Sequence, residues 1–145
     1  MSVSVAKGRS NARKKAMQAL YQWHMTGSDL IEIETQFHQE QNMEKVDVDY
    51  FHSLLHKVPT EIKTLDKLIA QYSERDEDEL DPIEQTILRL STYEMVNRID
   101  VPYKVVISEA IGLAKIFGSD KSHTFVNGVL DKLAKEFRKV ETEKN

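Results

Sequence analysis

The chain has 145 residues, no cysteine and a formal net charge of −4. Its length fits one domain that buries about two-thirds of its unfolded surface, and the lack of cysteine excludes disulfides, a thiolate nucleophile and a cysteine-ligated zinc site. The first 28 residues contain no long apolar run, so we expect no signal peptide and no membrane span, but a cytoplasmic protein without a membrane partner.

Charge is distributed unevenly along the chain. Residues 1–28 contain five basic residues and no acidic one, which gives them a charge of +5 and leaves −9 on the remainder. A basic segment on an acidic body indicates a small local site for an acidic partner, whereas the acidic body disfavours general binding of duplex DNA. We expect residues 1–8 to form a disordered basic arm. The alternative is a basic N-terminus that is merely solvated.

The spacing of apolar residues predicts helices, and no segment of consequence shows the two-residue alternation of a strand. Ser10 or Asn11 is expected to cap the first helix, and Gly27 to end it. In chain order the predicted helices cover approximately residues 11–26, 29–40, 47–58, 62–72, 81–98, 102–117 and 119–137. We therefore expect an all-α fold, a compact bundle of about seven helices in two helical subdomains.

The segment Ser73-Glu-Arg-Asp-Glu-Asp-Glu-Leu is mostly acidic, which predicts a solvated linker, and we place the boundary between the two subdomains near residues 73–81. The sequence Asp81-Pro82-Ile83-Glu84 follows. It combines a capping residue, a first-turn proline and an early carboxylate, which is typical of a helix start. The helix after it is apolar around much of its surface, and this predicts a central position.

The last two predicted helices meet at a tight turn. Gly118 is expected to adopt the left-handed conformation that ends one helix, and Ser119 or Ser122 to cap the next. The apolar face of that next helix is predicted to run from Val126 to Phe137. In the third predicted helix, the corresponding face begins at Val48.

Basic and aromatic residues outside the apolar faces indicate binding of single-stranded RNA, because lysine and arginine hold phosphates and aromatic rings stack on splayed bases. The phosphate candidates are Arg9, Arg13, Lys14 and Lys15. Arg13 lies over the apolar face but is expected to clear the core, one turn from the helix start. Tyr21 shares a helical face with Lys14, and Phe125 falls among lysines, Lys121 and Lys132. A boundary tyrosine with a half-buried ring is the alternative for Tyr21.

Three blocks of sequence resemble the NusB family of bacterial transcription antitermination factors. They are Gln18-Ala-Leu-Tyr-Gln-Trp, Ile87-Leu-Arg-Leu-Ser-Thr-Tyr-Glu and Phe125-Val-Asn-Gly-Val-Leu-Asp-Lys. The last block is specific, since Asn-Gly inside a helical pattern would otherwise indicate a hairpin turn. The resemblance implies an all-helical, non-catalytic protein that binds a short single-stranded RNA called boxA.

The resemblance also implies a protein partner. Binding of boxA would occur together with NusE, a ribosomal small-subunit protein (S-ten), and would act indirectly on the antitermination complex of RNA polymerase at ribosomal RNA operons. Glu84 and Tyr21 are then expected to contact NusE, and Tyr72 to contact RNA, although periodicity alone would bury Tyr72. A local role for Glu84 at the positive end of the helix dipole is the alternative. The chain departs from the resemblance at Lys121, where an acidic residue is expected, and its charge should strengthen RNA binding.

Motifs for catalysis and cofactors are absent from the sequence. His52 and His56 are four residues apart with Asp49 one turn before, a spacing that offers three metal ligands. No H-E-x-x-H motif accompanies them, so polar-face histidines are favoured. We therefore expect no enzyme, no metal and no cofactor. A non-catalytic helical dimerisation or scaffold module without RNA binding is the alternative function, and a homodimer of the free protein stays open.

Overall fold

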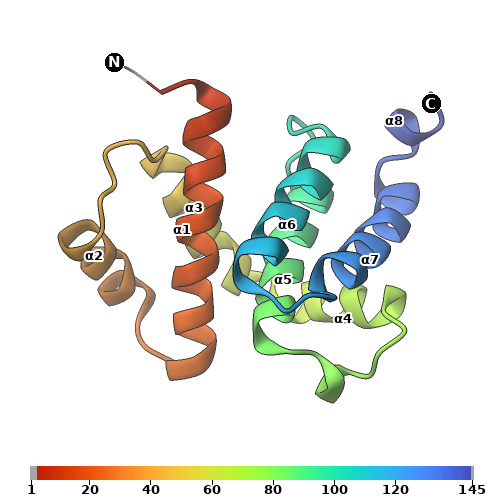
Figure 1. Cartoon of the computed structure of the whole chain (residues 1–145), viewed down its shortest axis with the longest axis horizontal. Coiled ribbons are helices and arrows are strands. Elements are labelled where there is room, and N and C mark those ends of the chain that lie inside the picture. Colours follow the sequence, from red (N-terminus) through yellow and green to blue (C-terminus); the bar gives the residue numbers. More distant parts are fainter. Residues whose placement is uncertain (1–2, 145) are drawn as a thin grey trace. The chain divides into compact units, whose positions relative to one another are not determined.

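The computed structural model of the chain describes residues 3–144, except for the side chain of Glu77. These residues form eight α-helices and one short 3-10 helix, and they contain no strand (Figure 1), so the all-α prediction is confirmed. The elements are α1 (Val5–Thr26), α2 (Leu30–Glu40), α3 (Val48–Thr60), α4 (Ile62–Tyr72), η1 (Glu77–Glu79), α5 (Pro82–Asn97), α6 (Tyr103–Phe117), α7 (Ser122–Phe137) and α8 (Lys139–Thr142). Among the described residues, no helix has the length and apolar character that crossing a membrane requires.

The chain forms two compact units, Met1–Thr60 and Glu61–Asn145. The first unit holds α1 to α3, and the second holds α4 to α8 with η1. The division therefore falls between α3 and α4, and the boundary that we expected near residues 73–81 is wrong. Pro59 lies one residue before the end of α3, where its missing N–H and its ring disfavour a continuous helix.

The acidic segment after α4 belongs to the second unit because its one arginine anchors it there. Arg75 Nη1 donates a hydrogen bond to Glu84 Oε1 at 2.7 Å, and the Arg75 guanidinium carbon lies 3.8 Å from the centre of the Phe125 ring. The Arg75 amide also donates to Ser73 Oγ at 3.0 Å. The many carboxylates of this segment predicted a solvated linker, and the charge pattern does not show that its one arginine has partners on α5 and α7.

Helix α1 begins earlier than the sequence indicated. Ser4, and not Ser10 or Asn11, caps it, since Ser4 Oγ accepts a hydrogen bond from the Lys7 amide at 3.2 Å. Residues 5–8, which were expected to be disordered, are helical. Residues 1–2, included in the same expectation, lie outside the described residues. A tertiary contact extends the helix: the Asp47 amide donates to the carbonyl oxygen of Gly8 at 3.1 Å.

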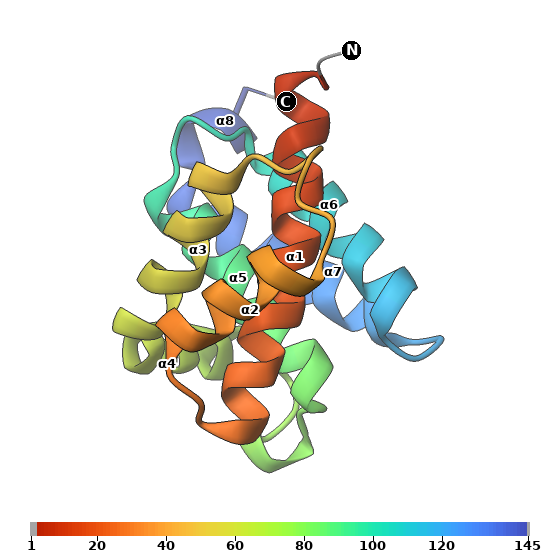
Figure 2. The ribbon, with the colours of Figure 1, turned by 90° about the vertical axis from the view of Figure 1, so that its left-hand side faces the viewer.

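The first unit has its core where α1 packs against α2 and α3, which lie beside it in both views (Figures 1 and 2). Small side chains on α1 let the helices approach closely, and larger side chains from α2 and α3 fill the space between them. The fully or almost fully buried apolar residues are Ala12, Ala16, Met17, Ala19, Leu20, Ile33, Phe37, Tyr50, Phe51, Leu54, Leu55 and Val58. Val48, predicted to face inward, is 41% exposed, because it is the first residue of α3.

Helix α5 is the centre of the second unit, as predicted. Asp81 caps it, with Asp81 Oδ1 accepting from the Ile83 amide at 3.3 Å, and Pro82 is its first residue. Every residue from Glu84 to Met95 is buried, because α4, α6 and α7 all pack against this helix. A helix that is apolar around much of its surface is expected in such a position, and its buried charged residues Glu84 and Arg89 have side-chain partners on neighbouring segments.

Arg138 closes the C-terminal end of α5. Its buried guanidinium donates to the carbonyl oxygens of Glu94 at 3.2 Å, Met95 at 2.8 Å and Arg98 at 2.8 Å, and also to that of Val101 at 2.8 Å. The last carbonyl groups of a helix have no partner within it. The guanidinium thus supplies a donor to the carbonyl oxygens of Met95 and Val101. It is a second donor for those of Glu94 and Arg98, which also accept from the Arg98 and Val101 amides at 3.0 Å.

Glu141 on α8 connects this arrangement to α6. Its carboxylate accepts from Arg138 Nη1 at 2.6 Å and from the amide of Tyr103, the first residue of α6, at 2.9 Å. Burial opposes ionisation of Glu141, but the two hydrogen bonds and the positive charge of Arg138 outweigh it and lower the pKa of Glu141 below its ordinary value. The ionised carboxylate thus caps α6, which begins after Pro102 without a side-chain cap of its own.

The turn between α6 and α7 differs from its prediction. Gly118 has φ −92° and ψ −176°, which is extended and not left-handed. Glycine is required there for space, since a Cβ atom would lie 2.6 Å from the Ser122 Cβ atom. Neither serine is the N-cap of α7, a position that Lys121 occupies. Phe137, predicted to be buried, is 38% exposed at the last residue of α7.

Candidate nucleic-acid interface

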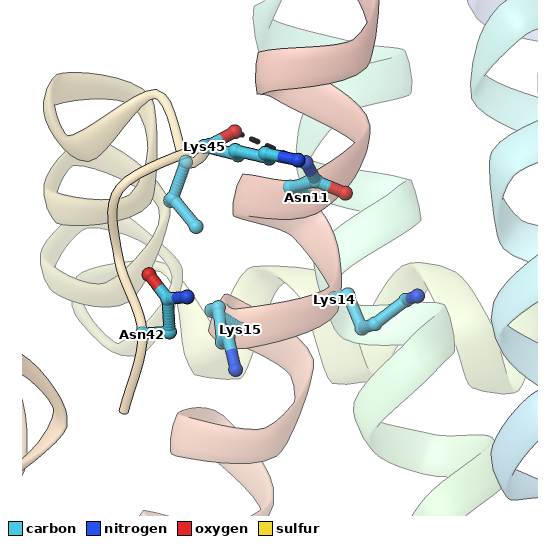
Figure 3. A pocket seen from close by; sticks show the side chains of 6 residues that line it. Asn11, Lys14, Lys15, Asn42 and Lys45 are labelled. Carbon is cyan, nitrogen blue, oxygen red and sulfur yellow. Dashed lines mark hydrogen bonds between the residues drawn. The ribbon is translucent and has the colours of Figure 1, made fainter. Parts of the chain in front are cut away.

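In the first unit, lysines from α1 and from the loop after α2 line an open pocket of about 240 Å³. Its lining consists of Asn11, Lys14, Lys15, Asn42, Lys45 and Val46, which include three lysines and no carboxylate. Asn11 Nδ2 donates to the carbonyl oxygen of Lys45 at 3.0 Å and so ties the loop to α1. Figure 3 shows that Lys14 and Lys15 leave α1 in different directions. The excess of positive charge suits an anion such as a phosphate.

Of the two arginines of α1, Arg13 is less accessible than these lysines. Arg13 is only 3% exposed, which is at odds with a direct phosphate contact. Its guanidinium carbon lies 5.4 Å from the ring centre of Tyr50, and that of Arg9 lies 4.6 Å from the same ring. Tyr50 is buried, so both arginines pack on an aromatic face at the junction of α1 and α3. Arg9 is partly buried.

Tyr21 lies on α1 and is partly buried, as are Lys14 and Gln18 on the same predicted helical face. The ring can therefore pack along the helix and still present an edge or a face to a ligand. Lys15 Nζ donates to Gln41 Oε1 at 2.8 Å, a contact between exposed side chains that a phosphate can replace. The sequence candidates of this unit that stay partly accessible are thus Arg9, Lys14, Lys15 and Tyr21.

In the second unit, Phe125 is one end of a chain of polar and aromatic contacts. The ring is partly buried and carries the Arg75 guanidinium on one face. Glu84 accepts from Arg75 and, through Oε2, from Ser122 Oγ at 2.7 Å. Ser122 Oγ in turn accepts from the Ser119 amide at 3.0 Å. These contacts connect the segment after α4 to α5 and α7.

Glu84 is therefore a buried structural group. It is 3% exposed, and both of its carboxylate oxygens are engaged. A carboxylate in this position cannot present a surface to a partner protein without breaking those bonds, so its burial is at odds with the direct contact to NusE that we expected. Its position in the first turn of α5 also favours the negative charge.

The other sequence candidates of this unit surround Phe125 on α7 or lie at the end of α4. Lys121 is exposed at the N-cap of α7. Lys132 is exposed as well, with its Nζ 3.6 Å from Glu74 Oε1, an ion pair that contributes little at such exposure. Tyr72 is the last residue of α4 and is partly buried. Periodicity predicted that Tyr72 is in the core, and the resemblance implied that it faces RNA; its partial burial is intermediate between the two.

Sequence reasoning missed three residues that the structure adds to these groups. Lys45 and Asn42 lie in the loop before α3, where no periodic pattern marks them, and they complete the lysine pocket. Arg75 is the one basic residue in an acidic run. That isolation was the signal that could have identified it, because a lone guanidinium among carboxylates forms strong charge-assisted hydrogen bonds.

Comparison with known proteins identifies the family. The model of the NusB family matches residues 10–135, which is most of the chain. The chain belongs to the NusB family. A transcription antitermination protein NusB of Pseudomonas savastanoi pv. phaseolicola is 51% identical over 144 residues, which cover 97% of this chain and 87% of that protein.

Solved structures of NusB proteins have the same fold. NusB of T. maritima is 30% identical and has a TM-score of 0.79, with 99% of both chains covered. A crystal structure titled as antitermination factors NusB and NusE in complex with dsRNA contains a chain that is 26% identical with a TM-score of 0.80, covering 88% of this chain and 96% of that one. Membership of the NusB family, which the three sequence blocks indicated, is thereby confirmed.

Proposed function

We propose that the chain is a transcription antitermination factor that binds boxA-type single-stranded RNA together with NusE and so helps RNA polymerase to read through terminators. The name of the antitermination relative and the complex of NusB and NusE with RNA support this proposal. The observation that carries it in this chain is the pocket with three lysines and no carboxylate. Such a pocket favours phosphate, and it has no catalytic group in its lining.

The proposed contacts divide into two kinds. Phosphates are held by lysines and an arginine that the structure leaves at least partly accessible, and bases stack on the two partly buried aromatic rings. The residues proposed to hold phosphates are Arg9, Lys14, Lys15, Lys45, Lys121 and Lys132. Those proposed to stack on bases are Tyr21 and Phe125, and Tyr72 is a further candidate for RNA contact. Arg13 and Glu84 hold other residues in place and do not touch the RNA or the partner. Tyr21 remains the proposed NusE contact.

A binding assay with three RNAs tests the proposal. Fluorescence anisotropy is measured for a boxA-like strand of about a dozen nucleotides, for its duplex and for a scrambled strand, each with and without NusE. We expect the single strand to bind more tightly than the duplex, because stacking requires bases that are not paired. Equal binding of strand and duplex would overturn the single-strand assignment. No binding of any RNA would favour a scaffold module instead.

The lysine pocket has a matched control. Lys45→Ala removes a charge from the pocket lining, and Lys57→Ala removes one from an exposed position on α3 outside it. If Lys45 contacts a phosphate, its loss lowers the slope of log affinity against log salt by about 0.7, whereas the Lys57 variant keeps the slope of the wild type. Equal slopes in both variants contradict a phosphate contact in the pocket.

A further inference from the structure

A carboxylate from α2 lies between two histidines of α3 in the first unit. His52 Nδ1 is 2.6 Å from Glu34 Oε2, and His56 Nε2 is 2.9 Å from Glu34 Oε1. The centres of the two imidazole rings are 4.3 Å apart, as expected for side chains one helical turn apart. One ligand atom from each of the three residues lies within 4.8 Å of the others. Asp49, the carboxylate considered from sequence spacing, is not part of this group.

We propose that Glu34, His52 and His56 form a binding site for a divalent transition-metal ion such as Zn²⁺. Two imidazole nitrogens and one carboxylate oxygen are a ligand set that Zn²⁺, Ni²⁺ and Cu²⁺ accept, whereas Ca²⁺ and Mg²⁺ require oxygen ligands. Zn²⁺ lies about 2.0–2.2 Å from such ligands, which puts tetrahedral ligand atoms about 3.3 Å apart. Each imidazole nitrogen has to move away from its carboxylate oxygen, now at 2.6 or 2.9 Å, by less than about 1 Å to reach that spacing. The two nitrogens, which lie within 4.8 Å of each other, have to approach by at most about 1.5 Å.

The exposure of these side chains suits an ion that enters from solvent. His52 is 60% exposed, His56 27% and Glu34 17%. The exposed imidazole can change rotamer at little cost, and three protein ligands leave a fourth position for water. The site shares no residue with the lysine pocket or with the Phe125 group, so it does not depend on the proposed RNA-binding function.

An ion bound here would connect α2 to α3. Glu34 is on α2, and both histidines are on α3. An ion coordinated by all three side chains would therefore link the two helices. Because the three residues are brought together only when the unit is folded, the ion binds the native state better than the unfolded chain and stabilises it. The competing account is a pair of hydrogen bonds from imidazole to carboxylate with no ion.

Titration with Zn²⁺ and Co²⁺ distinguishes these accounts. The full-length protein without a polyhistidine tag is titrated with Zn²⁺ by calorimetry and with Co²⁺ by visible absorption. We expect one ion per chain, an absorption typical of four-coordinate Co²⁺ and a rise in melting temperature with Zn²⁺. His52→Ala, His56→Ala and Glu34→Gln should each weaken binding of the ion by more than about tenfold. Loss of a residue that only hydrogen-bonds to a metal ligand already lowers metal affinity by about 10- to 100-fold, and loss of a ligand itself should cost more than the lower limit.

Two control variants match the ligand variants. His38→Ala removes an exposed histidine of α2, and Asp49→Asn removes the carboxylate favoured by sequence spacing. Both should bind the ion as the wild type does. Weak binding that survives loss of His52 or His56 would mean adventitious chelation and would overturn the site, as would the absence of binding in the wild type.

A measurement on the wild type keeps the test decisive if a variant fails to fold. Paramagnetic Co²⁺ broadens the NMR signals of nearby imidazoles. The signals of His52 and His56 should broaden first and most at substoichiometric Co²⁺, and that of His38, one helical turn from Glu34 on α2, should broaden less. Equal broadening of all histidine signals, or none, contradicts the proposal.

Discussion

Phe125→Ala separates stacking on RNA from packing within the protein. The ring lies on α7 and is partly buried. The Arg75 guanidinium carbon, 3.8 Å from the ring centre, covers one face. A base can therefore stack on the opposite face, or it must displace Arg75. The substitution removes the platform in either case, but it leaves the bond between Arg75 and Glu84 intact.

The structure allows both effects to be estimated. Complete burial of a phenylalanine side chain is worth about 1.5–3 kcal/mol, so a partly buried ring contributes roughly half of that. The contact with Arg75 adds about 0.5–1 kcal/mol at an accessible site. We expect an unfolding free energy lower by about 2 kcal/mol, which is less than the roughly 3–5 kcal/mol of a core phenylalanine. Loss of one stacked base costs about 1–3 kcal/mol of binding, roughly 5- to 150-fold in Kd.

Both quantities are measured on the same preparation, stability by denaturant unfolding and affinity by fluorescence anisotropy with a boxA-like strand. Phe137→Ala is the matched control, because this phenylalanine lies on the same helix, 38% exposed, outside the proposed RNA contacts. It should leave RNA affinity unchanged. A stability loss of core size in Phe125→Ala, with the affinity of the folded fraction intact, would refute the stacking role.

Three further predictions concern charged groups. Glu84→Gln should lower the unfolding free energy by about 1–3 kcal/mol, because it weakens a buried charge-assisted pair. The affinity of the folded variant for NusE, measured by calorimetry, should equal that of the wild type. A loss of NusE binding without a loss of stability would instead indicate a direct contact between Glu84 and NusE. The pKa of Glu141 is lowered from its ordinary 4.5, so the stability that its carboxylate contributes is complete above that pH and is lost as pH falls through the lower folded value. The unfolding free energies of wild type and Glu141→Gln should therefore converge in acid. A constant difference between them down to pH 2 would contradict this. The double variant Lys15→Ala, Lys45→Ala should lower the salt slope of RNA binding by about 1.4, and an unchanged slope would exclude both lysines from phosphate contact.

Local signals predicted the parts of the fold that depend on local physics. Asp81 caps α5, with Oδ1 accepting from the Ile83 amide at 3.3 Å. Gly27 ends α1 in the left-handed conformation with φ 69°. Each of these depends on a few neighbouring residues, which a sequence pattern contains.

Predictions that depended on tertiary contacts were less successful. Gly118 is required by the approach of Ser122 and not by its own backbone angle, and the start of α1 depends on a contact with Asp47. Arg13 was expected to clear the core, and the resemblance placed Glu84 at the NusE contact, but each is buried among partners from other helices or segments. A helical wheel shows which side chains share a face, and it does not show what packs against that face.

The candidate metal group illustrates the same limit. Spacing placed His52 and His56 on one face of a helix, and the geometry agrees. The carboxylate that completes the group is Glu34, which is 18 residues from His52 in sequence. No pattern within one helix could identify it, because only the packing of α2 on α3 brings it close.

The affinity for boxA-like RNA with and without NusE tests the central proposal most directly. The small basic sites of one chain give modest affinity alone, and a second RNA-binding protein on the same strand raises the effective concentration of each site. We predict that saturating NusE tightens binding of a single strand of about a dozen nucleotides by at least about tenfold, measured by fluorescence anisotropy at fixed salt. Equal affinity with and without NusE would contradict the account.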